Sequence, residues 1–416
     1  MASFTFLCSE CGARYREAEV RYVCPSCARA QRAGGATRGV LRVELDEVPR
    51  RWPAARLCDP AALAAFLPVA APISLPPLRV GGTPLLPVPE LRRRLGMPHL
   101  WVKDDSRNPS GSTKDRASLL VVAKAAEYGL DTIATASTGN AASALAAVAA
   151  SAGVRAVVFV PAAAPPAKLV QIASYGALLI PVDGSYDDAF ELSLAACHSF
   201  GWYNRNTAYN PFKIEGKKTA ALEIAAELAP DAPDAVVVPA GDGVIVAGVA
   251  KGFEDLVRGG LLARVPRLIV VQPEGSPALA RALRDRAAEV TPVADAASVA
   301  DSLVVRAPRN AAMALAVVRA SGGGGVLVSD DAILDAIGEL ARATGVFAEP
   351  AAAAALAGLL AALDEGIVAR DERVALLVTG SGLKDIAAAG RRIRIPSPVF
   401  PELQAVERLL DTREIH

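Results

Sequence analysis

Short apolar segments that alternate with helix-like segments from Leu100 onward constrain the fold of this chain most strongly. Each apolar segment is bounded by Gly, Pro or Asp, and periodic or Ala-rich stretches separate them. This pattern is typical of parallel sheets covered by helices on both faces. We therefore predict an α/β protein with two open, mostly parallel sheets. The expected strands cover residues 132–134, 157–160, 177–182, 235–238, 268–271 and 374–378.

Length and composition set the expected domain organisation. A chain of 416 residues with 52% hydrophobic residues is long enough for several cores. We expect a small N-terminal unit at residues 1–45 and a large cofactor-binding domain made of residues 46–120 and 225–416. A smaller substrate-side domain is expected at residues 121–224. The Ala-rich stretches at residues 141–150 and 351–362 are expected to be core helices.

Charge and hydropathy argue against several classes of partner. The formal net charge is +0 and the pI is about 6.9, so no nucleic-acid partner is expected. The first seven residues lack the basic start and apolar core of a signal peptide, and the longest apolar run, residues 350–363, is too short to span a bilayer. The prediction is a cytoplasmic protein without a membrane partner.

Lys114 stands in the run Asn-Pro-Ser-Gly-Ser-Thr-Lys-Asp-Arg, where a loop turns into a predicted helix at residues 115–128. A lysine that forms a Schiff base must hold its amine deprotonated at a fixed point. Burial lowers the pKa of a lysine readily, which suits this residue type to that role. Since a lysine at a helix start is commonly a solvated surface charge, this run does not decide the matter alone.

Three further loops lie at strand-to-helix junctions, at residues 136–143, 239–245 and 378–385. The first offers helix-start amides and hydroxyls that suit a carboxylate. The second offers glycines that let the backbone approach a phosphate, although Asp242 would repel that phosphate unless its side chain points away. The third offers the neutral hydroxyl of Thr379. Ordinary caps and turns explain each loop alone, but together with Lys114 they describe a pyridoxal phosphate pocket at the carboxyl ends of the strands.

These motifs resemble those of the fold-type II pyridoxal-phosphate enzymes, the tryptophan synthase β family, and most closely those of threonine synthases. The resembling segments are Ser-Thr-Lys-Asp-Arg at 112–116, Ser-Thr-Gly-Asn at 137–140, Phe-Ala-Glu-Pro at 347–350 and Thr-Gly-Ser-Gly-Leu-Lys-Asp at 379–385. The resemblance implies that Lys114 is the Schiff-base lysine, that Asn140 binds the 3′ oxygen of the cofactor and that Thr379 faces its pyridine nitrogen. It implies a cofactor-phosphate cradle made of Gly241, Asp242, Gly243, Val244 and Ile245, and a substrate-carboxylate loop made of Ser137, Thr138 and Gly139.

The chain departs from the resembled family at three places. The family usually carries Gly-Asn-Ala-Gly-Asn in the phosphate loop, where this chain has Gly-Asp-Gly-Val-Ile at 241–245. The family usually carries threonine after Ser-Thr-Gly-Asn, where this chain has Ala141. An Asn-Ser…Asn-Pro-Tyr-Arg segment often helps to bind the substrate phosphate, and here Asn206, Thr207 and Lys213 stand in that segment. Lys213 keeps the positive charge but loses the two-pronged fork of arginine.

The function implied is that of a threonine synthase, which converts O-phosphohomoserine and water into L-threonine and phosphate. Lys114 would act as base and shuttle protons at the α and β carbons, and Asn206, Thr207, Lys213 and Ser137 would bind the substrate phosphate. Ala141 favours an alternative, a β-elimination or β-replacement enzyme for a serine, threonine or phosphoserine-like amino acid, such as an ammonia-lyase or a cysteate-synthase-like enzyme. A non-catalytic protein is a third possibility, which an intact Lys114 argues against. A homodimer is expected.

The four N-terminal cysteines form two Cys-x-x-Cys pairs, Cys8 with Cys11 and Cys24 with Cys27, separated by twelve residues. This spacing is typical of a zinc-ribbon. Four cysteine ligands leave no open position, so the expected zinc is structural. Reduced cysteines in a site that has lost its metal are the alternative. Some threonine synthases resemble this chain in carrying such a ribbon.

Overall fold

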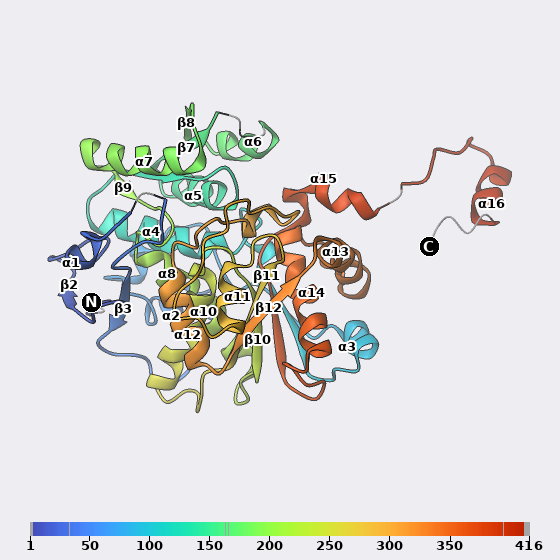
Figure 1. Ribbon diagram of the computed structural model, residues 1–416, viewed down its shortest axis with the longest axis horizontal. Coiled ribbons are helices and arrows are strands. Elements are labelled where there is room, and N and C mark those ends of the chain that lie inside the picture. Colours follow the sequence, from blue (N-terminus) through green and yellow to red (C-terminus); the bar gives the residue numbers. More distant parts are fainter. Residues whose placement is uncertain (1–2, 33, 163, 165, 394, 412–416) are drawn as a thin grey trace.

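The computed structural model of the chain describes residues 3–411 apart from residues 33, 163, 165 and 394 (Figure 1). Within this part of the chain the strands form a three-stranded, a six-stranded and a four-stranded sheet. The small N-terminal sheet is antiparallel, with the order β2-β1-β3, and the other two sheets are parallel except at one edge. The strands of the small N-terminal sheet are β1 (Phe4–Cys8), β2 (Arg14–Arg16) and β3 (Leu41–Leu45).

The six-stranded sheet forms the centre of the molecule and has the order β12-β11-β10-β13-β5-β4, with only β4 antiparallel to its neighbour. Its strands are β4 (Leu85–Leu86), β5 (Leu100–Asp104), β10 (Ala235–Pro239), β11 (Arg267–Pro273), β12 (Gly324–Val328) and β13 (Val374–Val378). One face packs against α3 (Pro89–Leu95), α13 (Asp330–Thr344) and α14 (Pro350–Asp364). The other packs against α9 (Thr219–Leu228), α10 (Val244–Arg258), α11 (Ala278–Arg284) and α12 (Ala311–Ala320).

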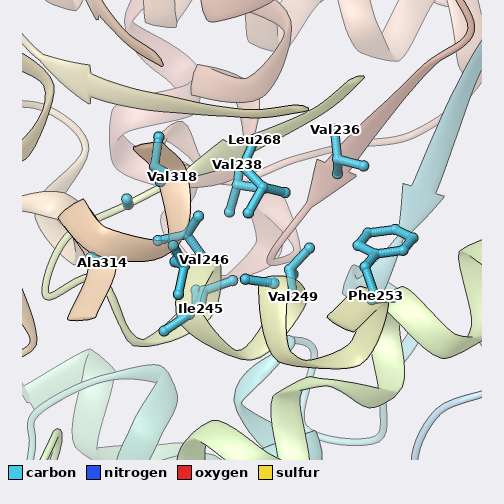
Figure 2. Packing of buried hydrophobic residues seen from close by; sticks show 14 of the residues in the cluster. Val236, Val238, Ile245, Val246, Val249, Phe253, Leu268, Ala314 and Val318 are labelled. Atoms are coloured by element: carbon cyan, nitrogen blue, oxygen red, sulfur yellow. The ribbon is translucent and has the colours of Figure 1, made fainter. Parts of the chain in front are cut away.

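Side chains of the central strands alternate between these two helical layers. Val236 and Val238 of β10 belong to the core under α10, whereas Val237, between them, belongs to the core under α14. Figure 2 shows Val249 and Phe253 of α10 in the first of these cores. Both are fully buried, and burying such a side chain contributes about 1.5–3 kcal/mol to stability. The continuous apolar strands of the sequence arise because both faces of this sheet are covered.

The four-stranded sheet is parallel throughout, with the order β8-β7-β6-β9. Its strands are β6 (Thr132–Ala136), β7 (Arg155–Pro161), β8 (Leu178–Val182) and β9 (Tyr203–Asn204). Helices α5 (Asn140–Ser151) and α6 (Pro166–Ser174) cover one face, and α7 (Tyr186–Phe200) covers the other. Helix α4 (Lys114–Glu127) packs beside α5 and links this sheet to the central body (Figure 1).

The remaining helices lie outside the two main sheets. Helices α1 (Pro25–Ala28) and α2 (Pro60–Ala64) belong to the N-terminal part, and α8 (Phe212–Lys217) lies between α4 and α10. After α15 (Ile386–Ala389), the chain runs outward to α16 (Leu403–Asp411), which stands apart from the body in Figure 1. In the described residues no helix combines the length and the apolar character needed to cross a bilayer.

The structure confirms the predicted fold class, with parallel sheets between helices. All predicted strands are present, and the two Ala-rich stretches are α5 and α14. The prediction did not name β4, β5, β9 or β12 of the two main sheets. Strand β12 begins inside the run Gly322–Gly325, which reads as a loop. Strands β6 to β9 fall inside residues 121–224 and those of the central sheet fall outside, while the proposed domain boundaries themselves stay a prediction.

Candidate active site

Three loops meet through backbone hydrogen bonds that form one short ladder. They are the loop before α4, the loop after β13 and the loop before α14. The amide of Thr113 donates to the carbonyl of Thr379 over 2.8 Å, and the amide of Ser381 donates to the carbonyl of Gly111 over 3.0 Å. The amide of Glu349 in turn donates to the carbonyl of Gly380 over 3.1 Å. This ladder fixes the start of α4, the end of β13 and the start of α14 against one another.

Lys114 is the first residue of α4, directly after this ladder. Its side chain is partly exposed, but the surrounding protein desolvates the amine and lowers its pKa below the ordinary value of 10.5. Nearby Glu349 opposes this shift and Arg205 reinforces it. A larger fraction of the Lys114 amine is therefore neutral near neutral pH, as nucleophilic or proton-transfer chemistry requires.

Asn140 of α5 and Glu349 before α14 join the parts of the molecule built on the two main sheets, close to the same ladder. The Asn140 amide donates to both carboxylate oxygens of Glu349, at 2.8 Å and 3.0 Å. Glu349 is 5% exposed, and burial raises the pKa of its carboxyl group. The sequence indicated the Phe-Ala-Glu-Pro segment but gave Glu349 no role, because its proximity to Lys114 and Asn140 is a property of the fold.

The predicted carboxylate loop opens onto a cleft between the two main sheets. Ser137, Thr138 and Gly139 are partly exposed and precede α5, whose first amides have no partner within the helix. A Cβ atom at Gly139 would meet nothing within 4 Å, so the backbone faces open space. The cleft has a volume of about 860 Å³, and its lining includes Gly139, Asn140 and Glu349.

The predicted phosphate loop lies between β10 and α10. Gly243 has a φ of +82°, and a Cβ there would press against Ala314, so this position requires glycine. Val244 and Ile245, both buried, begin the helix after Gly241, Asp242 and Gly243. An oxygen of the Asp242 side chain accepts a hydrogen bond from the Arg309 amide over 3.0 Å. The carboxylate is thus tied to the neighbouring loop, and its charge still opposes the lowering of the pKa values of Lys114, Lys213 and Lys217.

Lys213 lies inside the protein because α8 is held very close to two other helices. A Cβ at Gly216 would collide with the backbone of α4, and one at Gly248 would press against Lys217. These glycines let α4 and α10 approach α8 from two sides. Lys213 and Lys217, one helical turn apart, are consequently 3% and 2% exposed.

Most buried cations of the described chain have a carboxylate partner. These pairs are Lys103–Glu223 at 2.9 Å, Arg116–Asp105 at 2.7 Å, Lys124–Glu127 at 2.6 Å, Lys218–Asp255 at 2.8 Å, Lys251–Asp255 at 2.5 Å and Arg309–Asp187 at 2.6 Å. The exceptions among the described buried cations are Arg205, Lys213 and Lys217, which make no ion pair within that part of the chain. Burial, reinforced by Arg205, lowers the pKa of Lys213 and Lys217 well below 10.5.

The unpaired cations lie near Lys114, and the Arg205 guanidinium donates to the Lys114 carbonyl over 3.4 Å. Arg205 is fully buried, and its guanidinium donates to the Ser118 hydroxyl over 2.9 Å while its Nη1 has no hydrogen-bond partner. Each of the three lies close enough to Lys114 for their charges to interact. Asp242 and Glu349 influence this group, but neither forms an ion pair with the three residues in the described chain. Buried cationic groups without a directly paired carboxylate favour an anionic ligand at this place. The sequence indicated Lys213 but missed Arg205 and Lys217.

Asn206 and Thr207 differ in how far they are available to a ligand. The Asn206 side chain accepts from the Ala136 amide over 2.8 Å and donates to Ser193 over 2.7 Å, so it is engaged within the protein. Thr207 is partly exposed. This geometry favours Asn206 as a residue that shapes the loop, and its direct role toward a substrate stays a prediction.

Comparison with known proteins agrees with this geometry. The profile of the family described as pyridoxal-phosphate dependent enzyme matches residues 77–380. The threonine synthase of Methanocaldococcus jannaschii is 34% identical over 406 residues, covering 97% of this chain and 98% of the relative. That of Methanosarcina acetivorans is 36% identical over 394 residues, covering 91% of each. The chain belongs to the threonine synthase group of the pyridoxal-phosphate dependent enzymes.

Solved structures of related enzymes share the fold. Maize serine racemase matches with a TM-score of 0.64 and 22% identity, covering 80% of this chain and 92% of that chain. A fungal L-serine ammonia-lyase from Rhizomucor miehei matches with a TM-score of 0.64 and 23% identity, covering 74% and 96%. The likeness covers most of the chain and supports the fold described above.

The residues present fit the cofactor of this family. The start of α10 leaves backbone amides free for a phosphate, and Thr379 is 4% exposed at the end of β13 beside the loop that carries Lys114. Lys114 offers an amine with a lowered pKa. A phosphate cradle, a hydroxyl and a reactive amine are the groups that pyridoxal phosphate requires from a protein.

The four predicted metal ligands lie together in the N-terminal unit. All four sulfur atoms of Cys8, Cys11, Cys24 and Cys27 lie within 4.8 Å of one another. The Cys8–Cys27 and Cys11–Cys24 sulfur distances are 3.8 Å and 3.7 Å. Thiolates arranged tetrahedrally at about 2.3 Å from a zinc ion would lie about 3.8 Å apart. The donor set and spacing therefore fit zinc.

Proposed function

We propose that the protein is a threonine synthase that converts O-phosphohomoserine and water into L-threonine and phosphate. The observation that carries the proposal is a group of three buried cations without an ion pair in the described chain. They are Arg205, Lys213 and Lys217, and they lie near Lys114. A substrate that carries a phosphate dianion beside its reacting carbons supplies the charge that these residues lack. The threonine synthase relatives that match nearly the whole chain support the same reaction.

The residues of the site divide the work of this reaction. The bound cofactor supplies an electron-withdrawing ring, and its phosphate would lie on Gly241, Asp242, Gly243, Val244 and Ile245. The Lys114 amine removes and returns protons at the α and β carbons of the substrate. Ser137, Thr138 and Gly139 hold the substrate carboxylate at the start of α5.

The buried cations would bind the phosphate that leaves the substrate. It leaves the γ carbon as a dianion, and Lys213, Lys217 and Arg205 would stabilise that charge with charge-assisted hydrogen bonds. Thr207, at the edge of the same loop, can add a hydroxyl. Thr379 would give the cofactor's pyridine nitrogen a neutral partner, and Asn140 would turn from Glu349 to the 3′ oxygen.

The N-terminal unit is proposed to hold one structural zinc ion on Cys8, Cys11, Cys24 and Cys27, which the sulfur distances support. A homodimer in the cytoplasm completes the proposal.

The decisive assay incubates the purified holoenzyme separately with O-phosphohomoserine, O-phosphoserine, threonine and serine, and identifies the products. We expect threonine and phosphate from the first substrate at the highest kcat/KM. Efficient release of keto acid from serine or threonine, without turnover of O-phosphohomoserine, would replace the proposal with the ammonia-lyase alternative.

Lys213 provides a sharper test of the substrate phosphate. A charge-assisted hydrogen bond contributes about 1.5–3 kcal/mol, so Lys213→Ala should lower kcat/KM for O-phosphohomoserine about ten- to a hundredfold. Any deamination of unphosphorylated serine or threonine should hardly change, and Lys213→Arg should restore part of the loss. Equal losses on phosphorylated and unphosphorylated substrates would contradict a phosphate contact.

A further inference from the structure

The segment from β9 to α8 carries Arg205 and leads to Lys213, and it is held from two sides. On one side β9 pairs with β6, and the Arg205 amide donates to the carbonyl of Ala134 over 2.8 Å. β9 is the edge strand of its sheet, and the amide of Asn204, one residue before Arg205, points away from β6. An edge amide that is fully buried needs a partner from outside the sheet.

The N-terminal unit supplies that partner through Tyr22, two residues before Cys24. The Tyr22 hydroxyl accepts a hydrogen bond from the Asn204 amide over 3.0 Å. The Tyr22 ring stacks on Tyr209 with a centroid distance of 4.9 Å and lies 5.7 Å from Tyr203. One side chain of the ribbon therefore contacts both ends of the loop that contains Arg205. Figure 1 shows the N-terminal strands beside this part of the molecule.

Asn204 is the residue around which this loop is organised. Its side-chain oxygen accepts from the Asn206 amide over 2.7 Å, and its carbonyl accepts from the Asn210 side chain over 2.8 Å. A shift of Asn204 would therefore move Arg205 and the residues that lead into α8. The loop also contains Ala208 at a φ of 55°, a conformation that a non-glycine residue keeps only when its surroundings hold it.

A second contact reinforces the first at the start of α8. Phe4 and Phe6 of β1 meet Phe212 edge to face, with centroid distances of 5.8 Å and 5.6 Å. Phe212 directly precedes Lys213 in the chain. The N-terminal unit thus contacts both the loop that carries Arg205 and the helix α8 that carries Lys213 and Lys217.

We propose that Tyr22 is a positioning residue for the substrate phosphate. By capping the Asn204 amide, its hydroxyl fixes the loop so that Arg205 and Lys213 face the phosphate of the substrate. The N-terminal ribbon is then part of the substrate site, acting through this loop. This role of Tyr22 rests on the proposed function only for the name of the substrate. Binding of phosphate to the protein can be measured without turnover.

Tyr22→Phe separates this role from general support of the fold. The substituted ring keeps its stacking on Tyr209 and Tyr203 but cannot accept the Asn204 hydrogen bond. Tyr128→Phe is the matched control, because the Tyr128 hydroxyl also joins the N-terminal unit to the body, through Glu17 over 2.6 Å, without capping the loop. Both variants lose one hydroxyl at the same domain contact.

The experiment titrates inorganic phosphate into each holoenzyme by calorimetry. We expect wild-type protein and Tyr128→Phe to bind phosphate equally, and Tyr22→Phe to bind it about three- to tenfold more weakly. The visible absorption of the bound cofactor and the thermal midpoint of Tyr22→Phe should match those of the control. Unchanged phosphate affinity in Tyr22→Phe, or no phosphate binding by the wild-type protein, would overturn the proposal.

Kinetics with O-phosphohomoserine provide the second readout. Tyr22→Phe should raise KM by a similar factor and leave kcat within about twofold, because the reacting amine is untouched. A fall in kcat at unchanged KM would contradict a positioning role. If wild-type protein does not turn over O-phosphohomoserine, the proposed function fails, while the phosphate titration still decides the role of Tyr22.

Discussion

Two adjacent lysines, Lys217 at the end of α8 and Lys218 directly after it, differ in whether a carboxylate lies beside the amine. Lys218 lies against Asp255 at 2.8 Å, whereas Lys217, the preceding residue, makes no ion pair in the described chain. Taking a charge out of water costs several kcal/mol unless a partner compensates. Buried ionisable groups with strongly shifted pKa values are concentrated at functional sites. At this scale, the absence of a carboxylate beside Lys217 is what supports the proposed substrate phosphate site.

The same lysines predict a pH dependence for the cofactor-free protein. The pKa values of Lys213 and Lys217 are lowered by burial in the folded state, so the unfolded chain binds more protons between those values and 10.5. The free energy of unfolding should therefore rise with pH in that window, by up to about 1.4 kcal/mol per pH unit for each lysine. Urea unfolding at about pH 7, 8 and 9 measures the slope.

The double variant Lys213→Met, Lys217→Met supplies the comparison for this measurement. It should show a flatter dependence, because neither side chain titrates. Inorganic phosphate should also stabilise the wild-type protein more than the double variant. Identical slopes in the two proteins would show that these lysines are not the source of the pH dependence.

Lys114 carries a separate prediction. The purified protein should be yellow, because a cofactor joined to the Lys114 amine absorbs visible light, and Lys114→Ala should lose both this band and turnover. Absorption spectra and the product assay measure the two effects. An unchanged spectrum in Lys114→Ala would mean that another lysine holds the cofactor.

At the residue scale, the sequence could not reveal which buried cations form an ion pair with a carboxylate. Lys217 and Lys218 are adjacent letters, and only the packing of α8 between α4 and α10 shows that one meets Asp255 and the other does not. Arg205 was missed for the same reason. Lys114 was predicted because its loop and three further strand-to-helix loops each carry a local sequence motif, and these motifs together indicate one pocket.

At the scale of elements, the loops predicted to carry the site are the ones that follow β6, β10 and β13 in the structure. Local rules were sufficient there, since a buried strand that ends in glycine and enters a helix is visible in sequence. They failed for β12, whose first residues are glycines with no side chain to show periodicity. They also gave α8 no special place, because its burial depends on Gly216 and Gly248 meeting partners distant in sequence.

The N-terminal ribbon allows a test by metal removal. We expect about one zinc per chain, bound with the tetrahedral ligand set of a structural site, and loss of that metal in Cys11→Ser. Elemental analysis of dialysed protein measures it, and Cys58→Ser, a buried cysteine outside the cluster, is the control. A strong chelator should make the ribbon sensitive to proteases. Metal-free wild-type protein of full stability would contradict a structural zinc site.

The whole molecule brings two sheets together around one cleft, and a few side chains cross it. Lys384, after β13, donates to Ser143 of α5 over 2.9 Å and to Gln171 of α6 over 2.7 Å. Asn140 and Glu349 form a second link. The alternation of strands and helices predicted both sheets, but the contacts between them involve residues far apart in sequence, which no local pattern indicates.

The unpaired cations have a consequence for the lifetime of the protein in a cell. A newly made chain that has not yet met its ligands carries Arg205, Lys213 and Lys217 as buried basic groups without an ion-pair partner in the described chain, which costs stability. Ligands that bind only the folded state raise its stability by mass action. The empty form should therefore open more often and be degraded sooner than the filled one. Supply of cofactor and phosphorylated substrate would in this way set the abundance of the enzyme as well as its rate.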